Sequence, residues 1–207
     1  MPATPFLTRF LLCAVLCAGP AHALTVEVVA PEEIKALMMQ HLETARSARL
    51  GERMDAEEMA RLQRQSELTA RDLLATEGYF SPQVESAVEW LGDDWRVDYL
   101  IVPGVRTRVR SVKLEFDGGL KTAEDKAGLR ARIERNFLLK QGMPFRQADW
   151  DAAKLLVLQP LLLESYPTAQ IAASEARIDP AAHAADLTLT IDSGPVFVYG
   201  ALVIKGI

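Results

Sequence analysis

The chain has 207 residues, a net charge of −5 at pH 7, and 25% charged residues. This acidic balance argues against a nucleic-acid-binding protein, because such proteins usually carry a basic face. The sequence also has no polybasic patch of the kind that attracts a membrane surface. Both cysteines, Cys13 and Cys17, lie near the N-terminus, so the rest of the chain has no thiol for catalysis and no disulfide.

The first 23 residues have the pattern of a secretory signal peptide. Arg9 precedes an apolar run over residues 10–18, and Ala21-His22-Ala23 supplies the small residues that signal peptidase reads. The run is about half of the roughly 20 residues that span a bilayer. We expect cleavage after Ala23, with an uncleaved membrane anchor as the alternative. Both cysteines would leave with the signal peptide.

The first half of the mature chain predicts the order strand, helix, helix, strand, strand. Period-2 alternation indicates the strands, and apolar residues at helical spacing indicate the helices. The expected elements span residues 25–30, 31–45, 55–76, 83–90 and 95–101. Residues 46–53 are expected to form a polar loop. Asp55 with Glu58 matches a capping box at the start of the second helix.

The second half predicts the same order again. The expected elements span residues 112–116, 122–137, 147–164, 169–178 and 187–191. We expect Thr122 with Asp125 to cap the first of these helices. Pro160 lies inside the second helix, where it lacks a backbone donor, so a kink or break is expected there.

A long internal repeat connects the two halves. Tyr79 and Tyr166 lie 87 residues apart, and Gly104 and Gly194 lie 90 apart. This period is too long for a solenoid unit and favours small domains in series. We therefore expect domains at residues 24–104 and 105–194, and the first strand of a third, incomplete domain at residues 195–207.

The expected fold class is α+β. Each domain would be a three-stranded sheet with two helices on one face, and the other face would be partly wet. The last strand of each domain carries the clearest apolar alternation, so we expect it at the centre. The strands that follow Pro82 and Pro167 would then lie at an edge of each sheet.

The segments 75–80, 165–169 and 192–200 look like the helix-end turns and the inter-domain junction of polypeptide-transport-associated (POTRA) domains. In order and spacing, the mature chain resembles the periplasmic region of TamA-like outer-membrane autotransporter assembly factors. One departure is Pro167, which stands where the first domain has Phe80. The resemblance implies a periplasmic protein at the outer membrane that is not an enzyme and has no cofactor or metal.

The resemblance also implies partners. They would be a TamB-like protein anchored in the inner membrane and unfolded outer-membrane protein clients. Contact with a membrane would come only through a C-terminal barrel that this sequence lacks. Two alternatives stay open: the POTRA region of another barrel transporter, for two-partner secretion or general barrel assembly, and a periplasmic hydrolase or solute-binding protein. The last would need one large pocket with convergent polar groups.

No residue pattern predicts a catalytic or metal site. The sequence lacks the serine elbow and the paired-histidine zinc motif. We expect His41 to be half-buried and His183 to be solvated in a loop. Helix capping accounts for the acidic cluster Asp55, Glu57 and Glu58 better than cation binding does. Trp90 and Trp95 are expected to form a cross-strand pair, with an adhesive surface as the alternative.

The expected functional feature is a free strand edge. Such an edge shows unpaired backbone donors and acceptors, with which an extended client can pair as an added strand. The expected rows span residues 83–89 and 170–176, unless the neighbouring domain covers them. Glu85, Glu89 and Glu175 would then guard against aggregation. The residues expected to bind polypeptide are Gln83, Val84, Glu85, Ser86, Ala87, Gln170, Ile171, Ala172 and Ala173.

Overall fold

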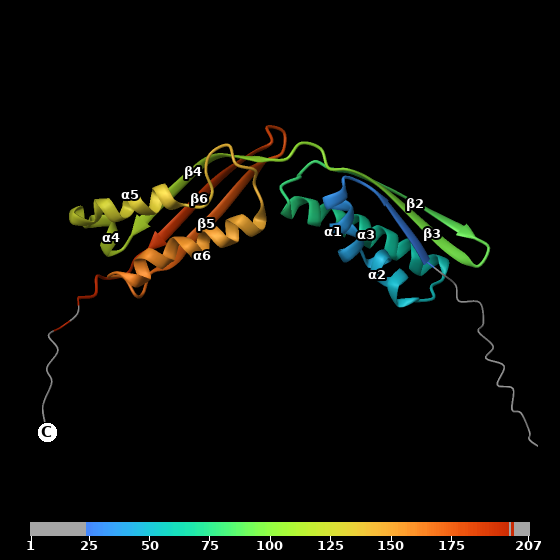
Figure 1. Cartoon of the computed structure of the whole chain (residues 1–207), viewed down its shortest axis with the longest axis horizontal. Coiled ribbons are helices and arrows are strands. Elements are labelled where there is room, and N and C mark those ends of the chain that lie inside the picture. Colours follow the sequence, from blue (N-terminus) through green and yellow to red (C-terminus); the bar gives the residue numbers. More distant parts are fainter. Residues whose placement is uncertain (1–23, 199, 201–207) are drawn as a thin grey trace, which may run out of the picture.

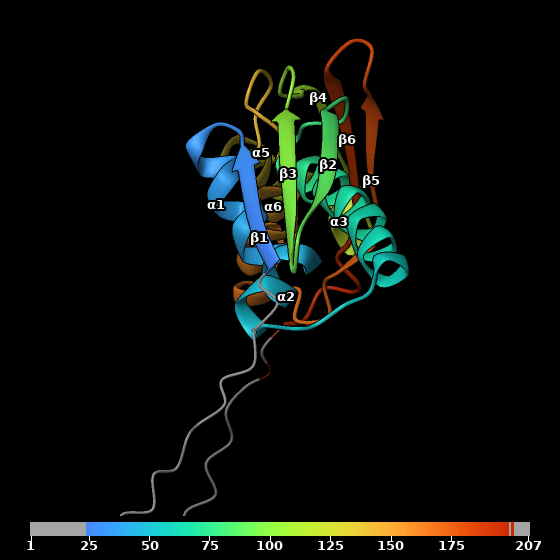
Figure 2. The same ribbon diagram turned by 90° about the vertical axis from the view of Figure 1, so that its right-hand side faces the viewer.

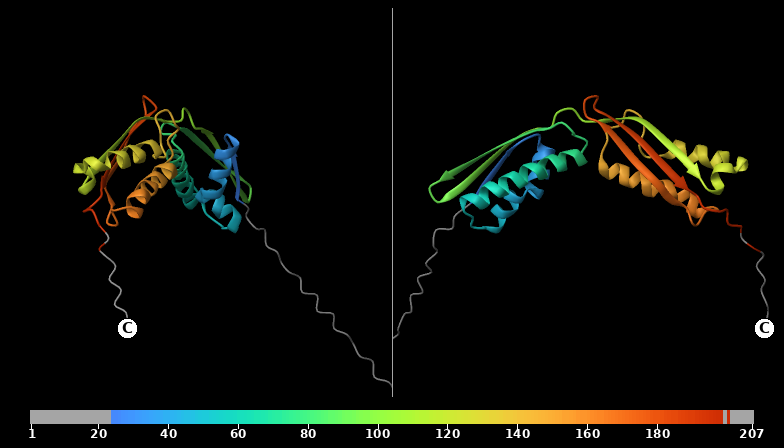
Figure 3. Two further views of the ribbon diagram at one scale, coloured as in Figure 1. Left: turned by 60° about the vertical axis from the view of Figure 1, so that its left-hand side comes forward. Right: turned by 180° about the vertical axis from the view of Figure 1, so that it is seen from behind.

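A computed structural model describes residues 24–198 and residue 200. These residues form two lobes, each with its own sheet, joined by residues 103–107 (Figure 1). The molecule is bent, with the strands on its outer side and the helices on its inner side; the view from behind in Figure 3 agrees. The predicted signal peptide, its cleavage residue Ala23 and most of the predicted strand over 195–207 lie outside the described residues.

The N-terminal lobe forms a mixed sheet with the strand order β1-β3-β2. Strand β1 runs parallel to β3, and β2 runs antiparallel to it. The last strand of the lobe is therefore central, as predicted. The elements are β1 (Leu24–Val29), α1 (Glu32–His41), α2 (Glu43–Leu50), α3 (Ala56–Thr76), β2 (Gln83–Leu91) and β3 (Asp94–Val102).

The prediction of a single helix followed by a polar loop over 46–53 was wrong. The chain turns at Leu42, which is extended and buried, and α2 then occupies most of the expected loop. The buried face of α2 includes the polar residues Thr44 and Ser47, so the segment reads as polar. The backbone N–H of Thr44 donates to Ser66 Oγ at 3.1 Å. Tertiary hydrogen bonds thus stabilise a helix that the sequence pattern alone does not indicate.

The C-terminal lobe repeats the arrangement with the strand order β4-β6-β5. Strand β4 is parallel to β6, and β5 is antiparallel to it. The elements are β4 (Arg108–Asp117), α4 (Gly119–Thr122), a 3-10 turn (Glu124–Lys126), α5 (Ala127–Asn136), α6 (Gln147–Leu163), β5 (Gln170–Asp179) and β6 (Ala184–Asp192).

The predicted start and cap of the first helix of this lobe were wrong. Helix α5 begins at Ala127 rather than after Thr122, and no side chain caps it. The preceding residues form α4 and the 3-10 turn instead. Of the kink or break predicted at Pro160, the break does not occur, because α6 continues to Leu163. Pro160 lies in the last turn of α6, so the helix gives up a single backbone hydrogen bond close to its end.

Each lobe buries its own hydrophobic cluster between its sheet and its helices. The largest fully buried side chains of the N-terminal cluster are Met38, Leu42, Met59, Leu74 and Tyr99. Those of the C-terminal cluster are Leu120, Leu139, Phe145, Leu161, Tyr166, Leu187 and Leu189. The predicted fold class, an α+β tandem of three-stranded sheets with helices on one face, is confirmed. None of the described helices is both long and apolar enough to cross a membrane.

Candidate functional site: the sheet margins

The residues predicted to bind polypeptide lie on the outer strands of both sheets. Residues 83–87 belong to β2 and residues 170–173 to β5. Among the strands of residues 24–198, each of these pairs only with the central strand of its sheet. Figure 2 shows β2 at one side of the N-terminal sheet, with β1 at the other. The two rows lie on different lobes and therefore form two separate margins. Among the described residues, no backbone hydrogen bond joins β2 or β5 to the other lobe.

The beginning of the β2 margin is partly covered by Arg71 of α3. One guanidinium nitrogen of Arg71 donates to the carbonyl of Pro82 at 3.3 Å, and the other to the carbonyl of Val84 at 3.1 Å. These two carbonyls are acceptors that an added strand would otherwise meet first. The sequence gives no sign of this contact, because Arg71 lies on a helix that reads as an ordinary solvated face.

Further along β2, polar side chains of α3 hold the strand through the side chain of Ser86. Gln63 Nε2 donates to Ser86 Oγ at 2.7 Å, and Ser86 Oγ donates to a carboxylate oxygen of Glu67. These bonds use the side chain of Ser86 and leave its backbone available. The exposed side chains of Glu85, Ala87 and Glu89 line the other face of the strand. The accessible part of the margin therefore begins at about Glu85.

The β5 margin is irregular where the sequence predicted binding. The register of β5 against β6 shifts between Ile171 and Ala173, so Ala172 is the extra residue of a β-bulge. A bulge bends its strand and interrupts the regular row of donors and acceptors. The pairing of β5 with β6 is regular from Ala173 to Asp179. The regular part of β5 thus begins at Ala173, so it includes residues 173–176 of the predicted row but not residues 170–172.

The junction between the lobes is built around Glu77 and Gly78. The carbonyl of Gly78 accepts a hydrogen bond from Thr107 N at 2.8 Å, and Phe145 N donates to the carbonyl of Thr107 at 2.9 Å. The Glu77 carboxylate pairs with Arg106 at 3.2 Å and with Arg146 at 2.9 Å. The hydrogen bond and charge of Glu77 raise the pKa of Arg146.

A pocket of about 330 Å³ lies beside this junction. Its lining includes Glu33, Glu77, Tyr79, Arg106 and Arg146. The periplasmic hydrolase considered above as an alternative would be favoured by a deep pocket at this junction with a buried pair of acidic residues. Glu77 is instead held between two guanidinium groups, which is the arrangement of a structural clamp. The sequence did not reveal the clamp, because its cations come from distant segments.

The same backbone contact recurs at the far end of the C-terminal lobe. Phe197 N donates to the carbonyl of Ser165 at 2.8 Å. Ser165 lies 87 residues after Gly78, and Phe197 lies 90 after Thr107. These are the spacings of the paired tyrosines and glycines, so the sequence period is also the period of the junction. Leu162, Phe197 and Val198 are exposed there, around a hollow of about 300 Å³.

The remaining sequence predictions had mixed outcomes. The Asp55 carboxylate accepts a hydrogen bond from Glu58 N at 2.9 Å, which confirms the helix cap. The rings of Trp90 and Trp95 lie edge to face with centroids 4.5 Å apart, which confirms the cross-strand pair. His41 is exposed at the end of α1, so its predicted half-burial was wrong. His183 lies in the predicted loop but is partly buried rather than fully solvated.

No family model and no curated protein matches the chain. Among solved structures, it is similar to BamA POTRA3-5 of Haemophilus influenzae, with a TM-score of 0.43, 17% identity, and coverage of 84% of this chain and 66% of that one. It is also similar to the N-terminal domain of Omp85 from Thermosynechococcus elongatus, with a TM-score of 0.40, 15% identity, and coverage of 82% of this chain and 60% of that one. A third similar structure is CdiB from Escherichia coli, with a TM-score of 0.31, 11% identity, and coverage of 92% of this chain and 29% of that one. Likeness at this level carries no conclusion about function.

Proposed function

We propose that this chain is a tandem pair of POTRA domains, at residues 24–104 and 105–194, that acts as a non-enzymatic scaffold in outer-membrane protein assembly or secretion. The observation that carries the proposal is the pair of successive lobes, each with its second strand, β2 or β5, at a sheet margin. Backbone pairing at such a margin depends little on side-chain sequence. It therefore suits clients that share only an extended, unfolded state.

The narrower proposal is a TamA-like assembly factor in the periplasm. It rests on the motifs at residues 75–80 and 165–169 and on the signal-peptide pattern of residues 1–23. The partner would be a TamB-like protein, and the clients would be unfolded outer-membrane proteins. The repeated junction contact at Phe197 supports a third unit that begins after Gly194 and covers the exposed apolar surface there.

We propose narrower client-binding rows than those predicted from the sequence. On β2, the row would run from Glu85 to Glu89, because Arg71 occupies the earlier carbonyls. On β5, it would run from Ser174 towards Asp179, beyond the bulge. Both rows carry exposed charges, Glu85 and Glu89 on one and Glu175 and Arg177 on the other. Such charges prevent edge-to-edge association of copies while leaving the backbone free.

A titration followed by NMR tests this function. The isotope-labelled mature chain would receive an N-acetylated octapeptide of alternating valine and threonine. We expect backbone amide shifts along residues 85–89 and 174–179, and loss of binding when alternate peptide amides are N-methylated, because methylation removes the donors of an added strand. Equal binding of the methylated peptide, or shifts confined to the helices, would contradict strand addition.

A further inference from the structure

The C-terminal sheet has a second free margin, along β4. Strand β4 has 10 residues, and β6 is its only partner among the strands that the structure describes. The corresponding strand of the N-terminal lobe, β1, has 6 residues, and both α1 and α2 pack against it. Among the described helices, only the short α4 makes comparable contact with β4. Helices therefore cover β1, whereas most of the β4 margin has no helix packed against it among the described residues.

The chain itself already pairs with the start of this margin. Val109 N donates to the carbonyl of Met143 at 2.8 Å, and the carbonyl of Val109 accepts from Gly142 N at 2.8 Å. Arg108 and Pro144 form an isolated antiparallel bridge. The pairing stops there, and a groove of about 640 Å³ follows between residues 110–114 of β4 and the segment after α5. The first rungs of an added strand are thus present, and the space for its continuation is open.

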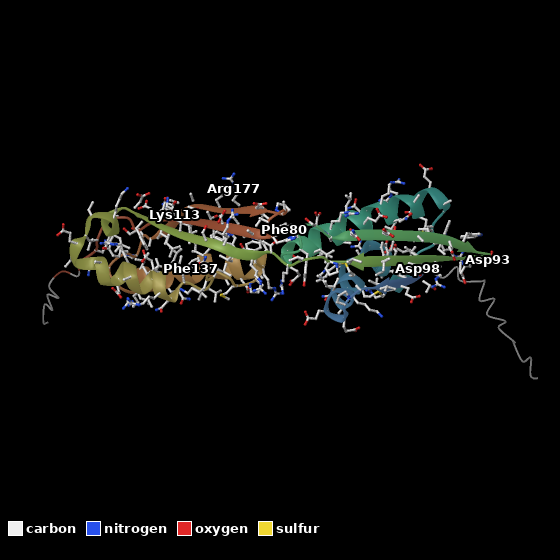
Figure 4. All side chains as sticks on the ribbon, turned by 90° about the horizontal axis from the view of Figure 1, so that it is seen from above. Phe80, Asp93, Asp98, Lys113, Phe137 and Arg177 are labelled. Atoms are coloured by element: carbon white, nitrogen blue, oxygen red, sulfur yellow. The ribbon has the colours of Figure 1, made fainter. Side chains whose placement is uncertain are left out.

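The floor of the groove is apolar and firmly held. Phe137 and Leu139 line it with exposures of only 4% and 0%, because both side chains belong to the C-terminal core. Val112 and Leu114 of β4 complete the apolar lining and are partly buried. In Figure 4, Phe137 and Arg177 lie on opposite sides of the sheet, which separates this groove from the β5 margin.

The rim of the groove is basic. Arg110, Lys113 and Lys140 line it together with one acid, Glu134. Arg110 pairs with Asp186, and Lys113 pairs with Glu115 at 2.6 Å. Lys140 Nζ instead donates to the carbonyls of Glu134 and Arg135, at 3.0 and 2.7 Å. Among the described residues, no carboxylate lies within ion-pair distance of Lys140. The positive charge of Lys140 is therefore available to pair with an acidic side chain of a bound peptide.

We propose that the β4 groove is a further polypeptide-binding site, for an extended segment that alternates apolar and acidic residues. The segment adds as a strand along residues 111–114, which pair regularly with β6 after a bulge at Arg110; this is a span of roughly 14 Å at about 3.4 Å per residue. Its apolar side chains contact the partly buried Val112 and Leu114, and an acidic side chain meets Lys140. The inference rests on strand addition as the proposed function but assigns it to a margin and a peptide chemistry of its own.

The test titrates the labelled mature chain with an N-acetylated octapeptide of alternating valine and glutamate. We expect amide shifts over residues 111–115 and 137–141. Lys140→Glu should weaken binding about fivefold, the scale of one exposed ion pair. Arg177→Glu makes the same change of charge at the β5 margin and should leave the affinity unchanged. Lys140→Gln, which keeps a donor for the α5 carbonyls, should weaken binding by about half as much on a logarithmic scale.

The outcomes separate this site from the general function. Shifts confined to β2 and β5, with weakening by Arg177→Glu rather than Lys140→Glu, would overturn the β4 site and leave the proposed function intact. Equal affinity for a valine–lysine octapeptide would overturn the acidic preference and with it the role of Lys140. Absence of binding by any margin at millimolar peptide would overturn both proposals.

Discussion

The two lobes share one order of elements but use different chemistry around their first strands. In the N-terminal lobe, α1 and α2 pack against a short β1. In the C-terminal lobe, a long β4 is left open beside the groove. What is common to both is the central last strand and the turn whose carbonyl accepts a hydrogen bond from the segment after the lobe. The repeat thus preserves the junction and the sheet while the cover of the first strand varies.

The same contrast appears inside the lobes. Tyr99 of β3 is buried, and its hydroxyl lies 3.1 Å from Thr44 Oγ1. Its counterpart 90 residues later on β6 is Leu189, which is fully buried in an apolar cluster. A polar network therefore surrounds Tyr99 in one lobe, whereas apolar packing surrounds Leu189 in the other. Because burial raises the pKa of Tyr99, its hydroxyl remains a neutral hydrogen-bonding group.

The largest expected effect on stability comes from Gly78→Ala, which disrupts the junction turn that both lobes have in common. Gly78 has a φ of +91°, and an added Cβ would overlap the carbonyl oxygen of Phe145 in the other lobe. We expect the free energy of unfolding to fall by about 2–3 kcal/mol and small-angle scattering to show a wider spread of inter-lobe distances. Gly51→Ala is the control, since its φ is +64° with no atom within 4 Å of the added Cβ. An equal loss for both variants would mean that the junction contributes nothing beyond backbone strain.

Tyr99→Phe tests the polar network of the N-terminal lobe. It removes the hydroxyl partner of Thr44, which is itself fully buried. We expect a loss of about 1–2 kcal/mol in chemical denaturation. Tyr79→Phe, at the more exposed junction, should cost less. If the Tyr99 variant is as stable as the parent, the hydrogen bond between Tyr99 and Thr44 contributes nothing to the stability of the N-terminal lobe.

Glu77→Gln tests the charge clamp between the lobes. It removes the anion that pairs with both Arg106 and Arg146. These side chains are partly exposed, so we expect a loss of about 1 kcal/mol at low salt that shrinks as salt is added. Glu58→Gln removes one exposed pair with Arg61 and serves as the control. A loss that is independent of salt would argue against an electrostatic clamp.

Periodicity in the sequence predicted the sheets well and the first helices poorly. The strands that begin at Gln83 and Gln170 follow from alternation and from the prolines before them, and both lie at margins. Helix α2 escaped prediction because its buried Thr44 and Ser47 look solvated until their partners are known. The limit there is physical, since a buried polar residue is recognisable only by the hydrogen bond that satisfies it.

The sequence predicted which strands form the sheet margins. It did not predict which backbone groups of those strands are free to pair with a client. Nothing local to β2 reveals that Arg71, on the preceding helix, reaches its carbonyls. Nothing in the run Ile171-Ala172-Ala173 marks the bulge, because no glycine accompanies it. The β4 groove depends on where the segment 142–144 leaves the strand. Each of these is a contact between segments distant in sequence, which no single-segment pattern contains.

Arg71→Ala tests how far the β2 margin differs from β5. It frees the carbonyls of Pro82 and Val84 without touching β5. We expect the valine–threonine peptide to bind about two- to threefold more tightly, because one or two more backbone hydrogen bonds form at a modest net gain each. Arg64→Ala, an exposed position on the same helix, should have no effect. Unchanged affinity for both variants would place the binding row entirely beyond Val84.

The smallest expected effect on stability concerns an ion pair between the first and last strands of each lobe. The two lobes place the cation and the anion of this pair on opposite strands. On β3, Arg96 pairs with Glu27 of β1 at 3.0 Å. At the position 90 residues later on β6, Asp186 pairs with Arg110 of β4. The hydrogen bonds from Arg110 and then Ser111 lower the pKa of Asp186 from 3.8 to about 2. The cation thus belongs to the central strand in one lobe and to the outer strand in the other.

Arg110→Gln should raise the pKa of Asp186 towards its ordinary value, measured by carboxyl NMR. A carboxylate whose pKa is lower in the folded state stabilises the fold above its unfolded pKa and ceases to do so as pH falls through the folded value. For Asp186 this window lies between 3.8 and about 2. The variant should therefore lose stability relative to the parent above the window and converge with it below. Lys113→Gln, on the same strand, should leave the Asp186 titration unchanged, and a shift there would assign the effect to the general field of β4 rather than to Arg110.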